Sequence, residues 1–319
     1  MKKNNHSAAR SWRQLDGVLL FDKPLELSSN TALQKVRRLF QAEKAGHTGT
    51  LDPLATGLLP VCFGEATKFS TALLDADKSY TATLRLGQTS TTGDAEGEII
   101  LERPVTFSQV ELDAVLARFC GEISQVPPMH SALKHQGKPL YEYIRNGITL
   151  EREARVVVIY ELLLQRWQGN EMVISVRCSK GTYVRTLAED IGEALGCGAH
   201  LTGLRRTAIA HFSLAGSYDF QQLTDMSDIQ RLACLLPVDS LMPDMPRLTL
   251  DAGQIDRLAK GQRLGLDTGL PDGKIALYGP QGFAGVVLQQ GRRVAPERLL
   301  AQVAKQAASM NLLENIVEQ

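Results

Sequence analysis

The pattern of hydrophobic and polar residues predicts β-strands in four parts of the chain. Residues 17–22 form a short apolar run, which predicts a buried strand. Residues 80–86 alternate, with Tyr80 on the apolar side, and this pattern predicts a half-buried strand. Two further strands are predicted at about 155–167 and 172–179, joined by a turn at Gly169-Asn170.

Three other segments have the period and the end signals of α-helices. Ser28 is a cap-type residue, and the apolar positions after it fall on one face through about residue 40. Ser108 and Glu111 have the spacing of a capping box at the start of a second helix. Residues 183–195 predict a third helix, which Gly196 ends.

The rest of the chain suggests a long loop and a second domain. Residues 124–150 have neither period and mix prolines, glycines, cations and tyrosines, so we expect a functional or disordered loop there. Pro243 and Pro246 indicate a linker, after which the runs KIALYG and FAGVVLQ predict a small β-rich domain. Strands and helices do not alternate regularly, so the fold class is α+β.

Composition and charge say little about the substrate. Lys and Arg together number 35, equal to Asp and Glu, so whole-chain charge gives no support for nucleic-acid binding. On composition alone we favour an enzyme that acts on a small molecule. No apolar run approaches the ~20 residues that a membrane span needs.

The cysteines and the first residues bear on the compartment. Five scattered cysteines without a C-x-x-C pair argue for reduced thiols in a cytoplasmic protein and against a zinc site. Residues 1–15 are basic but lack the apolar region of a secretory signal, so we interpret them as a mobile tail.

The segment Gly46–Gly57, GHTGTLDPLATG, is the strongest candidate for chemistry. Asp52-Pro53 alone has a structural interpretation, because Asp often caps a helix that begins with Pro. The surrounding glycines and small residues favour the alternative, an open loop that presents Asp52 as a functional group. His47 in the same segment could equally be a hydrogen-bonded structural histidine.

A second candidate lies in CSKGTYVRTL, residues 178–187, where a predicted strand meets a predicted helix. Tyr183 and Arg185 flank an inward-facing Val184 and could both stay near the end of the strand. A surface arginine and a core tyrosine are the alternative interpretation, and core packing is likewise an alternative for Tyr80.

These segments resemble the bacterial TruB-type tRNA pseudouridine synthases. The matching stretches span most of residues 16–240, and GHTGTLDPLATG followed by SKGTYVRTL is highly specific. They are DGVLLFDKP, SSN, AGHTGTLDPLATGLLP, GEATKF, Tyr80 with LRLG, HSALKHQGKPLYEY, CSKGTYVRTLAEDIG, GCGAHLTGLRRT and GRRVAPERLL.

The resemblance implies a pseudouridine-synthase fold: a mixed, largely antiparallel sheet with flanking helices and a central cleft. It implies a catalytic domain at 16–242, whose loop at about 124–150 clamps RNA, and a PUA-like RNA-binding domain at 247–319. The implied reaction isomerises a uridine of the tRNA T-loop, uridine 55 of the TΨC arm, to pseudouridine. We expect a cytoplasmic monomer that binds the tRNA T-arm, with no metal and no membrane.

The resemblance also assigns roles to individual residues. Asp52 matches the essential aspartate, Arg185 its ion-pair partner, and Tyr80 the tyrosine that stacks on the target base. Tyr183 and Leu204 match residues that line the uracil pocket, and His47 matches one that helps to extrude the nucleotide. We expect further RNA contacts from five cations: Lys23, Lys134, Lys138, Lys180 and Arg205.

One position departs from the family pattern. Lys23-Pro24 matches a motif that supports the catalytic loop, but Glu26 stands where the family usually has Gly. If that glycine serves a turn with positive φ, Glu26 strains the turn.

The reaction itself explains these residue types. Isomerisation conserves atoms and redox state, so it needs no cofactor, and the base must leave its stack to react. Asp52 must be ionised, which a buried carboxylate achieves with a cation such as Arg185. Attack at C1′, attack at C6 and removal of the C2′ proton all remain compatible with one carboxylate, and Tyr80 has the reach and type to assist loss of the C5 proton.

Two other function classes remain open from the residues alone. A hydrolase of glycosidic bonds would also act at C1′, but most such enzymes use two carboxylates, and the Asp52 loop offers one. An RNA-binding module with incidental isomerase activity is the second alternative.

Overall fold

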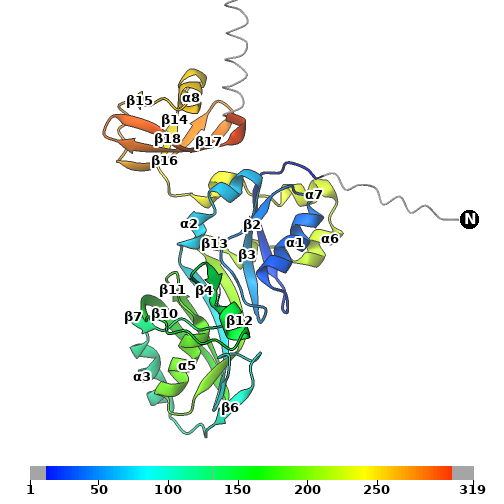
Figure 1. Ribbon diagram of the computed structural model, residues 1–319, viewed down its shortest axis with the longest axis vertical. Coiled ribbons are helices and arrows are strands. Elements are labelled where there is room, and N and C mark those ends of the chain that lie inside the picture. Colours follow the sequence, from blue (N-terminus) through cyan, green and yellow to red (C-terminus); the bar gives the residue numbers. More distant parts are fainter. Residues whose placement is uncertain (1–11, 132, 304–319) are drawn as a thin grey trace, which may run out of the picture.

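The computed structural model describes residues 12–131 and 133–303, which form a large sheet with flanking helices and a smaller sheet beyond it (Figure 1). Residues 1–11 of the predicted basic tail and residues 304–319 of the predicted second domain lie outside this described part. In the large, nine-stranded sheet, the two short strands β2 (Ala45–His47) and β13 (Phe212–Ser213) pair with β3 and β12. The other strands, in spatial order, are β1 (Gly17–Lys23), β3 (Ala55–Phe63), β12 (Ala199–Ile209), β4 (Lys78–Leu86), β11 (Glu171–Cys178), β10 (Arg155–Gln168) and β7 (Gly121–Gln125).

The centre of this sheet contains two strands that periodicity did not predict. β3 and β12 pair in parallel, whereas the other pairs are antiparallel. Gly57 and Pro60 obscure β3 in the sequence, because both residues are unfavourable inside strands. Gly57 is required where the two strands meet: its φ is +99°, and a Cβ there would lie 2.3 Å from the backbone oxygen of Arg206.

The predicted helices are present with the predicted end signals. Helix α1 (Ser29–Leu39) is capped by the Ser28 side chain, and α3 (Gln109–Arg118) begins with a complete capping box. Helix α5 (Val184–Ala194) ends before Gly196, whose φ is +77°. In Figure 1, α1 lies beside β1 and β3, and α3 and α5 lie at the other end of the sheet.

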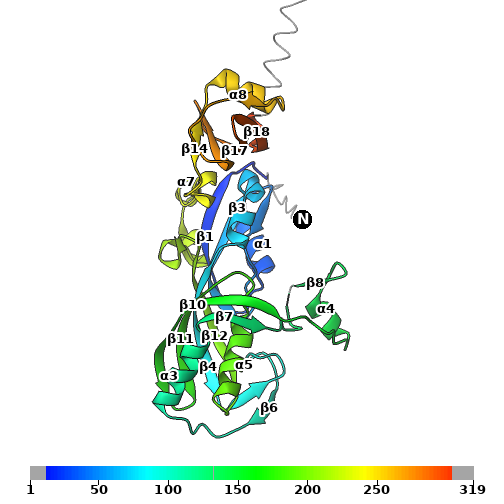
Figure 2. The same cartoon turned by 90° about the vertical axis from the view of Figure 1, so that its left-hand side faces the viewer.

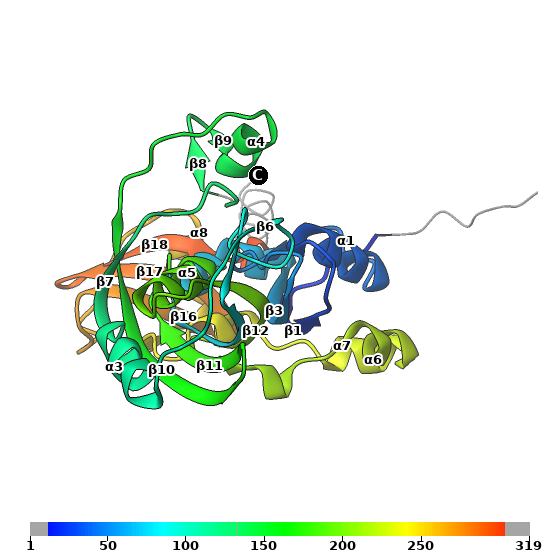
Figure 3. The same cartoon turned by 90° about the horizontal axis from the view of Figure 1, so that it is seen from below.

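The segment at 124–150 has more regular structure than expected. It contains a hairpin of β8 (Lys134–His135) and β9 (Lys138–Pro139), followed by helix α4 (Leu140–Arg145). The expectation of a loop without its own elements is therefore wrong for this part. The elements are too short for a periodic pattern to reveal them. The hairpin and α4 project to one side of the sheet (Figures 2 and 3).

Short elements connect the main ones. They are η1 (Gly64–Lys68), α2 (Thr71–Leu74), the pair β5 (Gln88–Ser90) and β6 (Ile99–Glu102), η2 (Leu214–Gly216), α6 (Phe220–Asp225), α7 (Asp228–Ala233) and η3 (Val238–Leu241). Among the described residues, no helix is long and apolar enough to cross a membrane.

The smaller sheet confirms the prediction of a β-rich C-terminal part. Its core is apolar and includes the side chain of Leu258 from the helix that packs on the sheet. Its elements are β14 (Arg247–Thr249), α8 (Ala252–Ala259), β15 (Leu264–Gly265), β16 (Gly273–Gly279), β17 (Gly282–Gln290) and β18 (Arg293–Leu299). The overall class is α+β, as predicted.

Candidate functional site

Asp52 lies in the turn between β2 and β3, and its neighbours fix the backbone on both sides. The Ser29 hydroxyl accepts a hydrogen bond from the Leu51 amide at 2.7 Å and lies 2.9 Å from the Leu51 carbonyl, to which it donates. Strand β3 begins at Ala55, three residues after Asp52. The helix-cap interpretation of Asp52-Pro53 is therefore wrong, because a strand follows this turn.

Lys23 supports the same turn from beneath. Its side chain is fully buried, and its Nζ donates to the carbonyls of Leu27 at 2.6 Å and Pro24 at 2.8 Å, and to that of Pro53 at 3.5 Å. The expectation that Lys23 contacts RNA is wrong in this structure, because no part of its side chain reaches the surface. Burial, the largest influence, lowers its pKa to about 8.

Glu26 adopts the conformation that a glycine would adopt more easily. Its φ is +66°, and its amide donates to the Pro53 carbonyl at 3.0 Å. The turn at Glu26 therefore has the positive φ that the usual glycine at this position of the family suggested. The same turn contacts the turn that holds Asp52.

Arg185, in the first turn of α5, forms an ion pair with Asp52. Its Nη2 lies 3.1 Å from Asp52 Oδ2, and its Nη1 lies 3.4 Å from Asp94 Oδ2. Nη1 also donates to the Thr92 carbonyl at 3.2 Å, and Nη2 to that of His130. The surface-arginine alternative is wrong, since the Arg185 side chain is 7 % exposed.

Asp52 is enclosed by protein but open on one side. Its side chain is 41 % exposed, and Asp52 lines the pocket described below. Burial raises its pKa, while the positive charge of Arg185 opposes the rise. The guanidinium partner therefore favours the ionised form of this carboxylate, which burial disfavours.

A pocket of about 260 Å³ lies next to this ion pair and brings together residues from distant parts of the chain. Five residues singled out in the sequence line it: Asp52, Tyr80, Tyr183, Arg185 and Leu204. The remaining lining residues are Gly49, Thr50, Leu51, Leu74, Lys78, Ser131, Leu133, Ser179, Gly181, Thr182, Val184 and Arg206. One carboxylate, one ion-paired cation, two aromatic rings and an apolar wall therefore share one cavity.

His47 does not line this pocket. It lies on β2, opposite Val61 of β3, and its Nδ1 is buried with no hydrogen-bond partner among the described residues. Burial, and then the charge of Arg206, lower its pKa, which favours the neutral imidazole.

The four other candidate RNA contacts occupy different parts of the surface. Lys134 and Lys138 are exposed on the β8–β9 hairpin. Lys180 pairs with Asp75 at 2.8 Å, and Arg205 of β12 pairs with Asp22 at 2.5 Å. All four keep exposed surface, and two of them already have acidic partners.

Sequence reasoning missed several residues that build the site. Asp94 is buried, and its carboxylate forms a second ion pair with the guanidinium of Arg185. Gln125 of β7 is buried and bonds both backbone groups of Tyr183, accepting from its amide at 3.0 Å and donating to its carbonyl at 3.3 Å. Lys78 donates its Nζ to three carbonyls at the end of α2, and burial lowers its pKa to about 8. Isolated residues of these types carry no local sequence signal.

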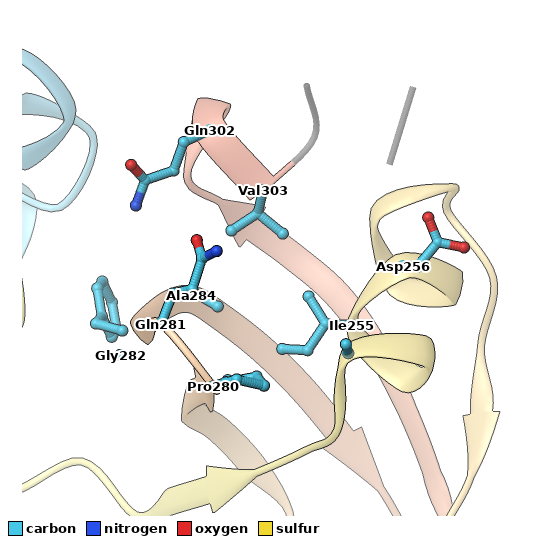
Figure 4. A pocket seen from close by; sticks show the side chains of 11 residues that line it. Ile255, Asp256, Pro280, Gln281, Gly282, Ala284, Gln302 and Val303 are labelled. Carbon is cyan, nitrogen blue, oxygen red and sulfur yellow. The ribbon is translucent and has the colours of Figure 1, made fainter. Parts of the chain in front are cut away.

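A second pocket lies in the C-terminal part, as Figure 4 shows, and it differs in chemistry. It measures about 130 Å³ and lies between α8 and the β16–β17 turn, with Ile255 and Val303 among its walls. Asp256 is the single ionisable side chain that lines it, and it pairs with Lys260 at 2.8 Å. In the part of the chain that the structure covers, no group of three or more His, Cys, Asp or Glu could hold a metal ion.

Comparison with known proteins identifies the family. The TruB family pseudouridylate synthase N-terminal domain matches residues 37–184, and the tRNA pseudouridylate synthase B C-terminal domain matches residues 185–243. The tRNA pseudouridine synthase B of Methylobacillus flagellatus is 55% identical over 295 residues, covering 92% of this chain and 98% of that protein. This chain belongs to the TruB family of pseudouridylate synthases.

Other TruB relatives and solved structures agree with this assignment. The tRNA pseudouridine synthase B of Chromobacterium violaceum is 61% identical over 250 residues, 78% of this chain and 82% of that protein. The fold is similar to that in the crystal structure of a Cbf5-Nop10-Gar1 complex, with a TM-score of 0.68 at 25% identity, covering 89% of this chain and 84% of that one. A structure of an H/ACA RNP bound to a substrate RNA containing 2′-deoxyuridine matches at the same TM-score and 22% identity, covering 94% and 93%. The TruB chain described here is therefore an enzyme with the pseudouridine-synthase fold.

Proposed function

We propose that this enzyme converts a uridine in the T-loop of tRNA, uridine 55, into pseudouridine, with Asp52 as the essential carboxylate. The observation that carries the proposal is the Asp52–Arg185 ion pair at the wall of a pocket that also contains two tyrosines. The names of the curated relatives support tRNA as the substrate. The five free cysteines suit a reducing compartment and hence the cytoplasm.

In this proposal the target nucleotide leaves its stack and enters the pocket. Tyr80 and Tyr183 offer aromatic faces that offset the lost stacking, worth about 1–3 kcal/mol per base, and Leu204 forms an apolar wall. Arg185 keeps Asp52 negative without blocking its open side, so the carboxylate can reach the sugar or the base. His47, which does not line the pocket, would act on the extruded nucleotide from outside it.

Contacts outside the pocket would hold the RNA by its shape and its phosphates. Lys134 and Lys138 lie on the projecting hairpin, where they could reach an RNA bound over the pocket. Lys180 and Arg205 would exchange their acidic partners for phosphates. The C-terminal sheet, which we interpret as a PUA-like domain at 247–319, would bind tRNA away from the reaction.

The test is tritium release from C5-labelled uridine in an unmodified tRNA transcript. We expect release by the wild type, and a loss of at least about 10⁴-fold for Asp52→Asn, with tRNA affinity changed by less than about threefold. The side chains of aspartate in the wild type and asparagine in the variant have nearly the same size and shape. The comparison therefore isolates the effect of the charge. A simultaneous collapse of affinity and activity would mean that Asp52 is structural.

Mass analysis of the product separates the alternatives. An isomerase leaves the mass of the RNA unchanged, whereas a glycosidic hydrolase releases free uracil. A chain that binds tRNA tightly without any tritium release would instead be a binding module.

A further inference from the structure

Leu74, the last residue of α2, is an exposed apolar side chain in the wall of the reaction pocket. It is 44 % exposed, whereas the other apolar residues that line this pocket are half-buried or buried. A single exposed leucine on a protein surface needs no explanation. In a pocket that also contains two aromatic rings, however, Leu74 leaves apolar surface that a bound ligand can cover.

The core packing of α2 keeps Leu74 out of the protein interior. Leu73 is 1 % exposed and belongs to an apolar cluster that includes Phe69 and Val18. Adjacent residues of a helix lie about 100° apart around its axis, so a Leu73 side chain in the core places Leu74 on a different side of α2. The exposure of Leu74 is therefore built into the way this helix packs.

Lys78 fixes the backbone at the end of α2. Its Nζ donates to the carbonyls of Leu74 at 2.7 Å, Ala76 at 2.5 Å and Leu73 at 3.3 Å. Lys78 is itself buried and lines the pocket, and these carbonyls replace the water that its ammonium group loses. A cation at this position satisfies carbonyls that the end of a helix leaves unpaired. The protein therefore holds Leu74 in place without RNA, which lowers the entropy cost of a contact with a ligand.

A second interaction joins the same segment to another wall of the pocket. Asp75, next to Leu74, pairs with Lys180 at 2.8 Å, and Lys180 lies between the lining residues Ser179 and Gly181. Both charged side chains are more than half exposed, so the pair adds little stability. If an RNA phosphate takes Lys180 from Asp75, the hydrogen bonds of Lys78 still fix Leu74.

We propose that Leu74 packs against the base of the extruded nucleotide and is a further substrate-binding residue of this enzyme. The inference rests on the proposed function, to which it adds a contact from α2. A leucine side chain offers no hydrogen bond to ribose or phosphate, so the flat face of the base is the part of the nucleotide that suits it. Covering Leu74 removes apolar surface from water and helps to keep the base out of its stack.

The test compares two tRNA ligands that differ only at position 55. One carries uridine there, and the other carries an abasic ribose. Dissociation constants are measured in an Asp52→Asn background, which prevents turnover. Leu74→Ala should weaken binding of the uridine tRNA by about tenfold and binding of the abasic tRNA by less than about twofold. Equal losses on the two ligands, or no loss on the uridine tRNA, would overturn the inference.

Two matched variants serve as controls. Leu74→Met keeps an apolar side chain of similar volume and should bind the uridine tRNA within about threefold of the parent. Ile229→Ala removes an apolar side chain that is 81 % exposed on α7 and does not line the pocket, so it should change neither dissociation constant. A tenfold loss in Ile229→Ala would mean that the effect of Leu74→Ala is not specific to the pocket, which would also contradict the inference.

Tritium release separates a failure of this inference from a failure of the proposed function. With Asp52 intact, Leu74→Ala should lower kcat/KM for the uridine tRNA by about tenfold, and Leu74→Met should restore it. A wild type that releases no tritium removes the proposed function, while the two dissociation constants still decide the contact. An active wild type with the same kcat/KM as Leu74→Ala removes this inference alone.

Discussion

At the scale of single residues, the site depends on balancing buried charges. Asp52 and Asp94 share the guanidinium of Arg185 at 3.1 Å and 3.4 Å, so two carboxylates depend on one cation. Burial raises the pKa of Asp52, Asp94 adds to the rise, and Arg185 opposes it. Replacement of Arg185 by Lys would keep a charge but lose the planar fork that reaches both partners.

The raised pKa of Asp52 makes a prediction about pH. The folded state binds the Asp52 proton more tightly than the unfolded state does. The contribution of Asp52 to the free energy of unfolding therefore falls as pH rises through its pKa in the folded state. We expect the free energy of unfolding of the wild type, minus that of Asp52→Asn, to fall as pH rises from about 3 to 6. The acid limb of kcat/KM should lie above the ordinary aspartate range for the same reason.

Urea unfolding of both proteins at several pH values measures this difference. Subtraction removes the contribution of the titrating groups that do not interact with Asp52, which the two proteins share. A difference that rises with pH would mean that Arg185 outweighs burial and that the Asp52 pKa is depressed instead.

At the scale of elements, the turn between β1 and α1 serves as a support for the catalytic turn. Lys23, Glu26 and Ser29 each bond the backbone of residues 51–53. These bonds explain why a fully buried lysine is tolerated: its Nζ has carbonyl partners in place of water. A change in this turn should therefore affect both stability and the position of Asp52.

Glu26→Gly should stabilise the protein. A non-glycine residue at φ +66° lowers the stability of the folded state by about 1–2 kcal/mol. Glycine has more conformational freedom in the unfolded chain, which cancels a part of the gain from the substitution. We expect a gain of about 0.5–1 kcal/mol in the free energy of unfolding, measured with urea. Glu26→Ala is the matched control: it removes the exposed carboxylate but keeps the strain, so it should show no such gain.

At the scale of the whole molecule, the C-terminal part packs on the connection between β3 and β4 and on η3. The rings of Phe69 and Phe283 meet edge to face at 5.6 Å, and Tyr278 donates its hydroxyl hydrogen to Asp239 at 2.7 Å. The Ala301 amide also donates to Glu65. Helix α2, which contributes Leu74 to the reaction pocket, lies directly after this contact.

We predict that the Phe69–Phe283 contact couples the two parts energetically. A double-mutant cycle with Phe69→Leu and Phe283→Leu should give a coupling free energy of about 1 kcal/mol in urea unfolding. The KM for tRNA should rise in each variant while kcat stays within about threefold, because the Asp52 site lies outside the contact. A large fall in kcat with unchanged KM would mean that the contact controls the chemistry instead.

The local pattern of the sequence alone determined several of the secondary-structure elements of this protein. Period and end signals are local properties of the backbone, so strand 80–86, the Ser108 capping box and helix 183–195 were predictable. The motif around Asp52 marked the candidate reaction centre for a similar reason, since its glycines and small residues are adjacent in the chain.

Only the tertiary structure decided which side chains surround that centre. The antiparallel pairing of β12 with β4 places Arg206 opposite Tyr80, and the first turn of α5 brings Arg185 to Asp52 and Asp94. These contacts join residues more than 90 positions apart, and neither periodicity nor composition encodes a pairing at such separation. The burial of Lys23 could not be predicted from the sequence either, because the free energy of a buried charge depends on the groups that fold around it.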